Sequence, residues 1–144
     1  MASNNSAKAN SICSIQNSIE PVASAAAVSG TWVLASAAYQ WLAIVNAGTV
    51  GTSVDAKIEQ ATDSSGSSVK DLSGSSITQL VAAGTAAIQF RQNQLDTANG
   101  FDYVRLTITK VGATTVAGGV LLALSSMYEP LANVATVDEV ITVA

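Results

Sequence analysis

Apolar and polar residues alternate most regularly over positions 53–61. One set of alternate positions is apolar and the other is polar: Val54, Ala56 and Ile58 against Ser53, Asp55, Lys57 and Glu59. Successive side chains of a strand point to opposite faces, so this period of two predicts a strand with one buried face and one solvated face.

Other segments extend this pattern along the chain. Alternation or continuous apolar character predicts further strands at 40–47, 69–72, 87–95, 103–109 and 116–128. Residues 40–47 are apolar on both sides, which predicts a central strand covered on both faces. Ile77, Leu80 and Val81 have the spacing of a single helical turn. Asp, Ser, Asn and Gly are concentrated between these segments, as is typical of turns.

The length of 144 residues suits one domain built from these short strands. Short strands separated by turns favour an all-β fold, an antiparallel β-sandwich of the jelly-roll or immunoglobulin-like kind with extended N- and C-terminal arms. We expect residues 1–20, rich in Ser, Asn and Ala, to be a flexible N-terminal arm, and residues 21–130 to be the β-sandwich domain. Residues 131–144 are expected to be a C-terminal tail, which either adds a last strand to its own sheet or exchanges with a neighbouring subunit.

The charge content points to an assembled protein. Charged residues make up only 11% of the chain, against about a quarter in an average soluble protein. A surface with so few charges favours association, so we expect much of it to be covered in an assembly that includes other copies of the protein, a homo-oligomer. The net charge of −4 and the scattered basic residues argue against nucleic acid as a partner.

Two segments bear on export and membranes. The first residues, Met1 to Ser11, lack the apolar core of a signal peptide, so export by that route is not expected. The uncharged stretch 21–54 is long enough to cross a bilayer. Its alanines, serines and threonines and its lack of flanking basic clusters favour buried strands instead, and no membrane partner is expected.

The search for chemistry is negative. The chain contains no histidine, which excludes Ser-His-Asp, Cys-His and zinc-histidine sites. Asp55 and Glu59 flank Lys57 on one strand face, which is typical of a solvated, charge-balanced face rather than of paired carboxylates for glycoside hydrolysis. The turn aspartates lack the spacing of a calcium loop, no phosphate-binding glycine motif occurs, and the single Cys13 has no partner for an internal disulfide. We therefore predict no catalytic, cofactor-binding or metal-binding residue, and we do not expect an enzyme.

Large aromatic residues and the apolar residues of the tail are the candidates for an interface. Aromatic rings also stack on sugars, but these lie within apolar segments, where packing in a core or an interface is commoner. The candidate interface residues are Trp32, Tyr39, Trp41, Tyr128, Val137, Val140 and Ile141.

Short segments with the character of strands and turns carry a resemblance to a known family. They are Gln60-Ala61-Thr62-Asp63, Ile77-Thr78-Gln79-Leu80, Leu95-Asp96 with Asn99-Gly100-Phe101, and Tyr103-Val104-Arg105-Leu106. Through them, the part of the chain from about Trp41 to Pro130 is similar to small virion proteins of tailed bacteriophages that are encoded near the major capsid protein. The segments supply no functional site.

The resemblance implies a β-sandwich or jelly-roll protein that binds and stabilises the assembled phage capsid lattice, a head decoration or cement protein. Its partners would be the major capsid protein and other copies of itself. Its location would be the virion, assembled in the host cytoplasm. Two alternatives stay open, a neck, tail or baseplate structural protein of the virion and a carbohydrate-binding adhesion module.

Overall fold

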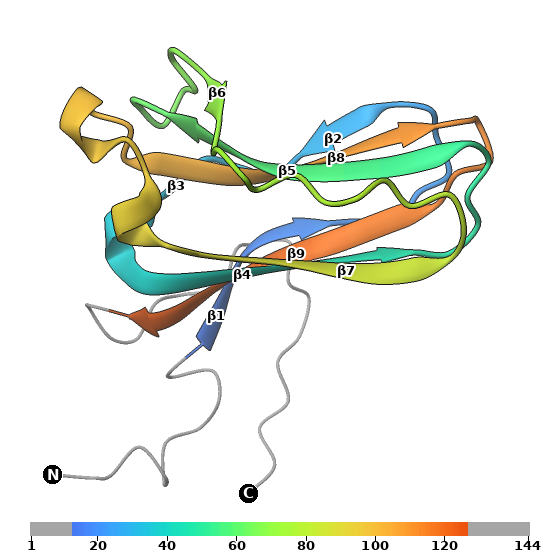
Figure 1. Cartoon of the computed structure of the whole chain (residues 1–144), viewed down its shortest axis with the longest axis horizontal. Coiled ribbons are helices and arrows are strands. Elements are labelled where there is room, and N and C mark those ends of the chain that lie inside the picture. Colours follow the sequence, from blue (N-terminus) through green and yellow to red (C-terminus); the bar gives the residue numbers. More distant parts are fainter. Residues whose placement is uncertain (1–12, 127–144) are drawn as a thin grey trace, which may run out of the picture.

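Two antiparallel sheets lie face to face in the computed structural model, which describes residues 13–126 (Figure 1). The strands are β1 (Cys13–Ile19), β2 (Ala27–Ser29), β3 (Val33–Leu34), β4 (Ala38–Ala47), β5 (Ser53–Ala61), β6 (Lys70–Asp71), β7 (Gly84–Arg91), β8 (Tyr103–Val111) and β9 (Ala117–Ser126). Short 3-10 turns are η2 (Ala35–Ala37), η3 (Gln92–Gln94) and η4 (Thr97–Asn99). No helix in this part of the chain is long and apolar enough to cross a membrane.

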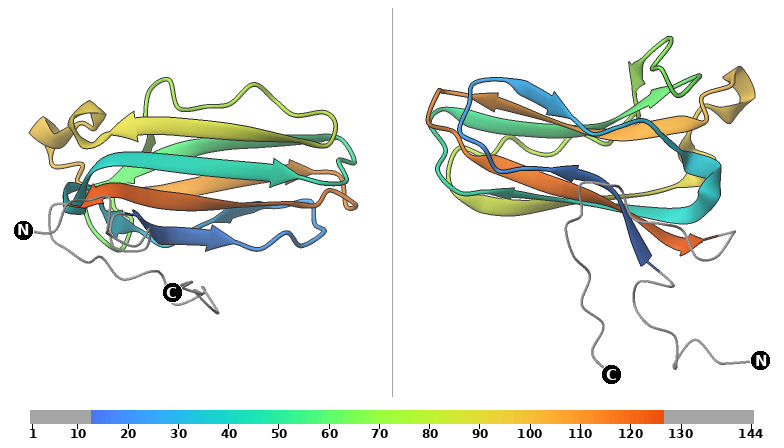
Figure 2. Two further views of the ribbon diagram at one scale, coloured as in Figure 1. Left: turned by 90° about the horizontal axis from the view of Figure 1, so that it is seen from below. Right: turned by 180° about the vertical axis from the view of Figure 1, so that it is seen from behind.

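The order of the strands defines the topology. The four-stranded sheet has the order β1-β9-β4-β7, seen side by side from below in Figure 2, and the five-stranded sheet has the order β2-β8-β5-β6 with β3 also paired to β8. β2 and β3 pair with two parts of β8 and act as one interrupted strand. When β2 and β3 are counted as one strand, the first strand, β1, pairs with the last, β9, and the second, β2 with β3, pairs with the next to last, β8. Inside these pairs, β4 pairs with β7 and β5 pairs with β6. This nested pairing, folded over into two sheets, is a jelly roll, and it decides between the two predicted topologies.

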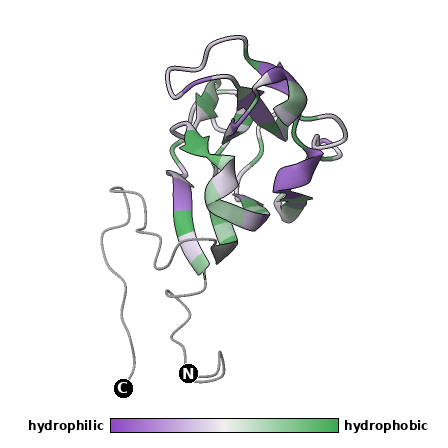
Figure 3. Ribbon diagram, turned by 90° about the vertical axis from the view of Figure 1, so that its left-hand side faces the viewer, coloured by the Kyte–Doolittle hydropathy of each residue, from purple (hydrophilic) through white to green (hydrophobic). Residues whose placement is uncertain are grey.

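The core lies between the sheets and is built from alternate residues of the strands, so hydrophobic and hydrophilic residues follow one another along them (Figure 3). Ile58 on β5 and Leu106 on β8 are fully buried. The Trp41 ring of β4 stacks on Phe90 with ring centroids 6.1 Å apart, and its Nε1 donates to the Ala35 carbonyl at 3.2 Å. The inward faces predicted for the segments that form β5, β7 and β8 are confirmed.

The N-terminal boundary of the domain differs from the prediction. Residues 13–19 of the expected arm form β1, which pairs with β9, and Ser14 and Asn17 are buried. The sequence hides this strand because Ile19 is its only large apolar side chain that is buried, whereas its other two buried side chains, Ser14 and Asn17, are polar. Residues 1–12 and 127–144 lie outside the described residues, so the rest of the predicted division stays a prediction.

Asn17 joins the two sheets at a point where the register of β1 against β9 shifts. Its Nδ2 donates to the carbonyls of Gln16 and Thr31, both at 2.8 Å, and its Oδ1 accepts a hydrogen bond from the Leu106 backbone N at 2.9 Å. Gly30 lies against this side chain, because a Cβ at Gly30 would fall 2.2 Å from the Asn17 Cγ. A buried polar side chain of β1 is therefore bonded to β8 of the opposite sheet.

Residues 72–80 cover the free edge of β5. Their backbone bonds this strand at several points, among them Ile77 N to Ala56 O at 3.0 Å and Leu80 N to Val54 O at 2.9 Å. The helical turn predicted from Ile77, Leu80 and Val81 is wrong, because the backbone N of Ile77 and of Leu80 donate to carbonyls of β5.

Candidate protein interaction surface

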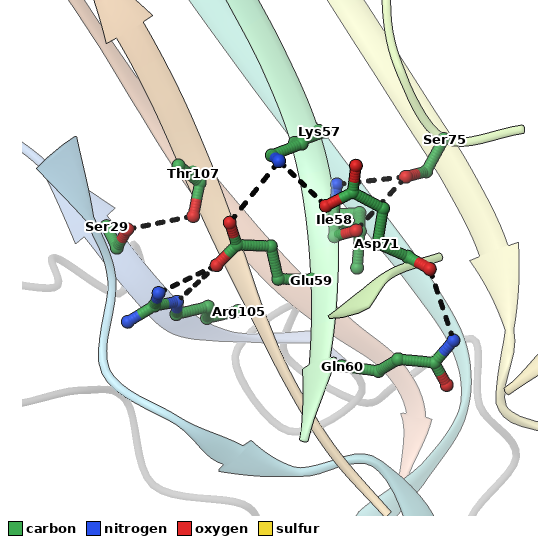
Figure 4. A network of polar contacts seen from close by, with 9 residues as sticks. All are labelled: Ser29, Lys57, Ile58, Glu59, Gln60, Asp71, Ser75, Arg105 and Thr107. Atoms are coloured by element: carbon green, nitrogen blue, oxygen red, sulfur yellow. Dashed lines mark hydrogen bonds and ion pairs between the residues drawn. The ribbon is translucent and has the colours of Figure 1, made fainter. Parts of the chain in front are cut away.

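The outer face of the five-stranded sheet is polar. Its outward residues on β5 and β8 include Asp55, Lys57, Glu59, Arg105, Thr107 and Thr109. Arg105 donates to Glu59 Oε2 from Nε at 2.8 Å, and its Nη2 lies 2.7 Å from the same oxygen (Figure 4). The Lys57 Nζ lies 3.5 Å from Glu59 Oε1 and 2.7 Å from Asp71 Oδ1. Lys57, Glu59 and Arg105 are thus joined by ion pairs, and Asp55 accepts a hydrogen bond from Gln79 at 2.9 Å.

The partners of Lys57 also affect its protonation. The hydrogen bond to Asp71, together with the charges of Asp71 and Glu59, raises the pKa of Lys57 against an opposing effect of burial. The hydroxyls of Ser29 and Thr107 lie 2.8 Å apart on the same face. The predicted charge balance of this face is therefore confirmed, whereas its predicted solvation holds for Asp55 and Lys57 but not for Ser53 and Glu59, which are buried.

The outer face of the four-stranded sheet is apolar along its two central strands, β4 and β9. We call the following side chains the apolar face: Leu42, Ile44, Val120, Leu122 and Leu124. Because Trp41, Ala43 and Val45 point into the core, alternation directs the residues between them outward. The register places Leu42 beside Leu122 and Ile44 beside Val120. All five side chains are partly exposed, and residues 40–47, predicted to be covered on both faces, are covered by described elements on one face only.

A hollow of about 460 Å³ lies at one end of the apolar face. Its lining is mainly apolar, with Ile19, Pro21, Ile44, Val116, Gly118 and Val120, and also includes the polar Ser18, Glu20 and Asn46. A Cβ at Gly118 would lie 2.5 Å from the Ile19 carbonyl oxygen, so the close approach of these two backbones requires glycine. An apolar hollow of this size suits apolar side chains of a partner rather than a charged ligand.

Polar residues border the apolar face beside the edge strand β7. In the register of β4 with β7, Gln40 lies beside Arg91 and Leu42 lies beside Gln89. A second hollow, of about 430 Å³, lies here and extends to Leu124. An apolar centre with a polar rim is the usual arrangement of a protein–protein interface.

Two of the predicted interface residues lie at the surface. Tyr39 is 58% exposed and precedes the rim residue Gln40. Trp32 is partly exposed, with the Arg105 guanidinium 4.3 Å from its ring centroid. A Cβ at Gly66, which has a φ of +81°, would fall 2.3 Å from Trp32 Nε1, so the glycine lets its loop approach the indole. Trp32 therefore has a packing role within the subunit.

Trp41 is a correction, because it is only 1% exposed and belongs to the core. The apolar face contains its neighbours Leu42 and Ile44 instead, which sequence reasoning missed. The signal was present, since 40–47 is apolar on both sides, but the pattern does not say which side meets the second sheet. The remaining predicted interface residues lie outside the described residues: Tyr128, Val137, Val140 and Ile141.

The aspartates of the turns have structural roles, as predicted. Asp63 Oδ1 accepts hydrogen bonds from the backbone N of Ser65 at 2.9 Å and of Ser67 at 3.1 Å. The Ser67 hydroxyl donates to Oδ2 at 2.6 Å, and this hydrogen bond contributes most to lowering the pKa of Asp63. Lys70 and Asn99 bind the carboxylate of Asp96 and lower its pKa. Over residues 13–124, no group of three or more Cys, Asp and Glu side chains is placed to hold a metal ion.

No protein-family model and no curated protein matches the chain. Among solved structures, the empty virus-like particle of cowpea mosaic virus is similar over 87% of this chain and 88% of that chain, with 11% identity and a TM-score of 0.47. Broad bean stain virus is similar over 87% and 94%, with 13% identity and a TM-score of 0.46. The Bacillus endospore appendages are similar over 86% and 100%, with 19% identity and a TM-score of 0.35. At such low identities and TM-scores, these similarities assign neither a family nor a function to this chain.

Proposed function

We propose that this protein is a virion structural protein that binds the assembled capsid lattice of a phage, as a head decoration or cement protein, and that the apolar face is its contact surface. The difference between the two outer faces of the sandwich carries this proposal. Most charges of the polar face form ion pairs with one another, whereas the apolar face exposes adjacent aliphatic side chains. Contiguous exposed apolar side chains mark a surface that another protein covers.

Two features of the sequence support the proposal. The low charge content favours a subunit with many neighbours. The resemblance of the segment from Trp41 to Pro130 to small phage virion proteins implies the major capsid protein and further copies of this chain as those neighbours. The virion is then the place where the protein acts.

Stabilisation of a shell by such a protein follows from mass action. A protein that binds only the assembled lattice stabilises it by the free energy of binding. Burial of apolar surface contributes about 25 cal/mol per Å², so five partly exposed side chains supply a modest contact for each copy. Repetition of that contact over a closed shell makes the sum large.

The direct test compares shells with and without the protein during heating and osmotic shock. We expect shells that carry the protein to survive to higher temperature and larger shock. Equal survival of the two kinds of shell would contradict the cement role, whichever surface is used.

A matched pair of variants tests the surface itself. Leu122→Lys places a charge in the centre of the apolar face, where partner contact would desolvate it, and should abolish binding to shells. Thr109→Lys places the same charge on the polar face beside Asp55, its cross-strand partner, and should bind as the wild type does. If both variants bind equally well, the apolar face is not the contact surface.

A neck, tail or baseplate position would use the same apolar face. The number and place of copies in a particle separate these roles, because decoration spreads many copies over the head, whereas a neck or tail component forms a small ring. The carbohydrate-binding alternative loses one of its two tryptophans, since Trp41 is buried. Binding to a glycan array that disappears in Trp32→Ala would favour that alternative.

A further inference from the structure

The outer edge of β7 carries backbone groups that no described strand pairs. In an antiparallel ladder, a strand bonds its two neighbours through alternate residues. Gly48 N donates to Val116 O at 2.9 Å and continues the ladder of β4 with β9, so the even-numbered residues of β4 bond β9. The odd-numbered residues of β4 therefore bond β7, through their partners at positions 84, 86, 88 and 90. The N–H and C=O groups of Thr85, Ala87 and Gln89 are left pointing away from the sheet.

This edge lacks the features that usually protect an edge strand from pairing with another chain. β7 contains no proline and pairs with β4 without a register shift, and its one charged residue, Arg91, is its last. Residues 72–80 bond the edge of β5 in the other sheet. Within residues 13–126, by contrast, nothing bonds the outward backbone groups of Thr85, Ala87 or Gln89. An uncovered edge of this kind is a template for a strand of another chain.

The free backbone groups of β7 match those of a second copy of the same strand. In an antiparallel pair centred on Ala87, this residue faces Ala87 of the second copy, and Thr85 faces its Gln89. This is the one register that pairs all three free residues of each copy, and the three pairs exchange about six hydrogen bonds. A register that sets Thr85 opposite Arg91 is weaker, because Arg91 N already donates to Gln94 Oε1 at 2.8 Å.

The side chains of β7 are complementary in the register centred on Ala87. The large residues Ile88 and Phe90 are buried on the inward side of the strand. They fall opposite Ala86 and Gly84 of the second copy, so a large residue meets a small one at each of these positions. Arg91 lies beyond the residues that pair, so no like charges face each other.

We propose that two copies of this chain associate through the free edges of β7, with Ala87 beside Ala87, and that their four-stranded sheets thereby join into one continuous sheet. The two-fold axis of such a pair is perpendicular to the sheet, so the apolar faces of both copies lie on the same side. The association goes beyond the proposed function and does not depend on it.

Disulfide formation in the full chain tests the register, with Cys13→Ser as the background. In a hydrogen-bonded antiparallel pair the two Cα atoms lie about 5.5 Å apart, a distance that a disulfide spans. Ala87→Cys should therefore give a covalent dimer under mild oxidation. Thr85→Cys is the control, because it is also exposed on β7 but would lie four residues, roughly 13 Å, from its equivalent in the second copy. A dimer yield from Ala87→Cys no higher than that from Thr85→Cys would overturn the proposal.

Sedimentation of the full chain tests the association without a covalent bond. The wild type should show a dimer that dissociates on dilution. Ala87→Pro removes the N–H that faces the second copy but no hydrogen bond of the ladder with β4, so it should weaken the dimer about tenfold or more. An unchanged circular dichroism spectrum would show that this variant is folded.

Leu122→Lys is the matched control for sedimentation, because it changes the apolar face and leaves the edge of β7 intact. It should dimerise as the wild type does. A wild type that stays monomeric would overturn the proposal. A dimer that survives in Ala87→Pro and is lost in Leu122→Lys would also overturn it, because the apolar face would then join the copies. Neither measurement uses shells, so these outcomes are distinct from a failure of shell binding.

Discussion

Asn17→Ala removes the side chain that bonds the two sheets to each other. The Leu106 N–H, which donates to Asn17 Oδ1 at 2.9 Å, would be left buried without an acceptor, at a cost of about 1–3 kcal/mol. The Gln16 and Thr31 carbonyls would also lose the Nδ2 donor, a smaller loss because a carbonyl tolerates an unfilled lone pair better. We expect the free energy of unfolding to fall by about 2–4 kcal/mol.

Urea unfolding followed by tryptophan fluorescence measures this loss. With an m-value of about 2 kcal/mol per molar urea, the midpoint should fall by about 1–2 M. Ser18→Ala is the control from the same strand, because its hydroxyl makes only an exposed contact of 3.4 Å to Glu20. A loss below about 0.5 kcal/mol, the usual scatter for surface changes, would refute the view that Asn17 holds the sheets together.

The same side chain predicts a coupling with Gly30. Gly30→Ala should destabilise the wild type strongly, because its Cβ would fall 2.2 Å from both Cγ and Oδ1 of Asn17. It should cost less in the Asn17→Ala background, where these two atoms are gone and only the contact with the Asn17 Cβ at 2.7 Å remains. Additive losses in a double-mutant cycle would contradict this packing.

Three further outcomes are expected. Gly66→Ala should lose about 1–3 kcal/mol of stability, because the residue has a positive φ and its new Cβ would meet Trp32. The loss should exceed that of Gly74→Ala, whose φ of +78° is similar but whose Cβ would meet nothing within 4 Å. Equal losses in urea unfolding would contradict the contact with Trp32. The folded-state pKa of Asp96 is lowered, so the ionised carboxylate stabilises the fold above the unfolded pKa of about 3.9, and this stabilisation is lost as pH falls through the folded pKa. The difference in stability between the wild type and Asp96→Asn should therefore close below about pH 4. A difference that widens there would be inconsistent with the lowered pKa. Burial raises the pKa of Cys13, so a disulfide reagent at pH 8 should modify it more slowly in the folded protein than in urea; equal rates would show an exposed thiol.

Much of the fold was predictable because a strand records its two faces in every second residue. Val54, Ala56 and Ile58 are buried as their alternation predicts, and Lys57 and Glu59 form ion pairs on the opposite face. The turn roles of the aspartates were predictable for a similar reason, since the hydrogen bonds of Asp63 are made within a few residues of the chain. Features that depend on residues close together in the sequence can be predicted from the sequence.

The features that the sequence concealed depend on distant contacts. Asn17 looks like part of a polar arm until Leu106, far away in the chain, supplies a donor to its carbonyl oxygen. Ile77, Leu80 and Val81 have the spacing of a helical turn, yet the backbone N of Ile77 and of Leu80 donate to the edge of β5. In both cases a partner from another part of the fold outweighs the local preference.

The sequence by itself determined that this protein is an all-β sandwich, that one face of 53–61 is polar, and that residues 40–47 are apolar on both sides. Only the tertiary structure decided that the topology is a jelly roll, that Trp41 belongs to the core, and that Leu42 and Ile44 belong to the apolar face. The physical reason is that alternation assigns residues to two faces without saying which face meets the other sheet. The packing of the two sheets answers that question, because it buries Trp41, Ala43 and Val45 in the core. The pairing of β4 with β9 then brings together two apolar rows that are far apart in the chain.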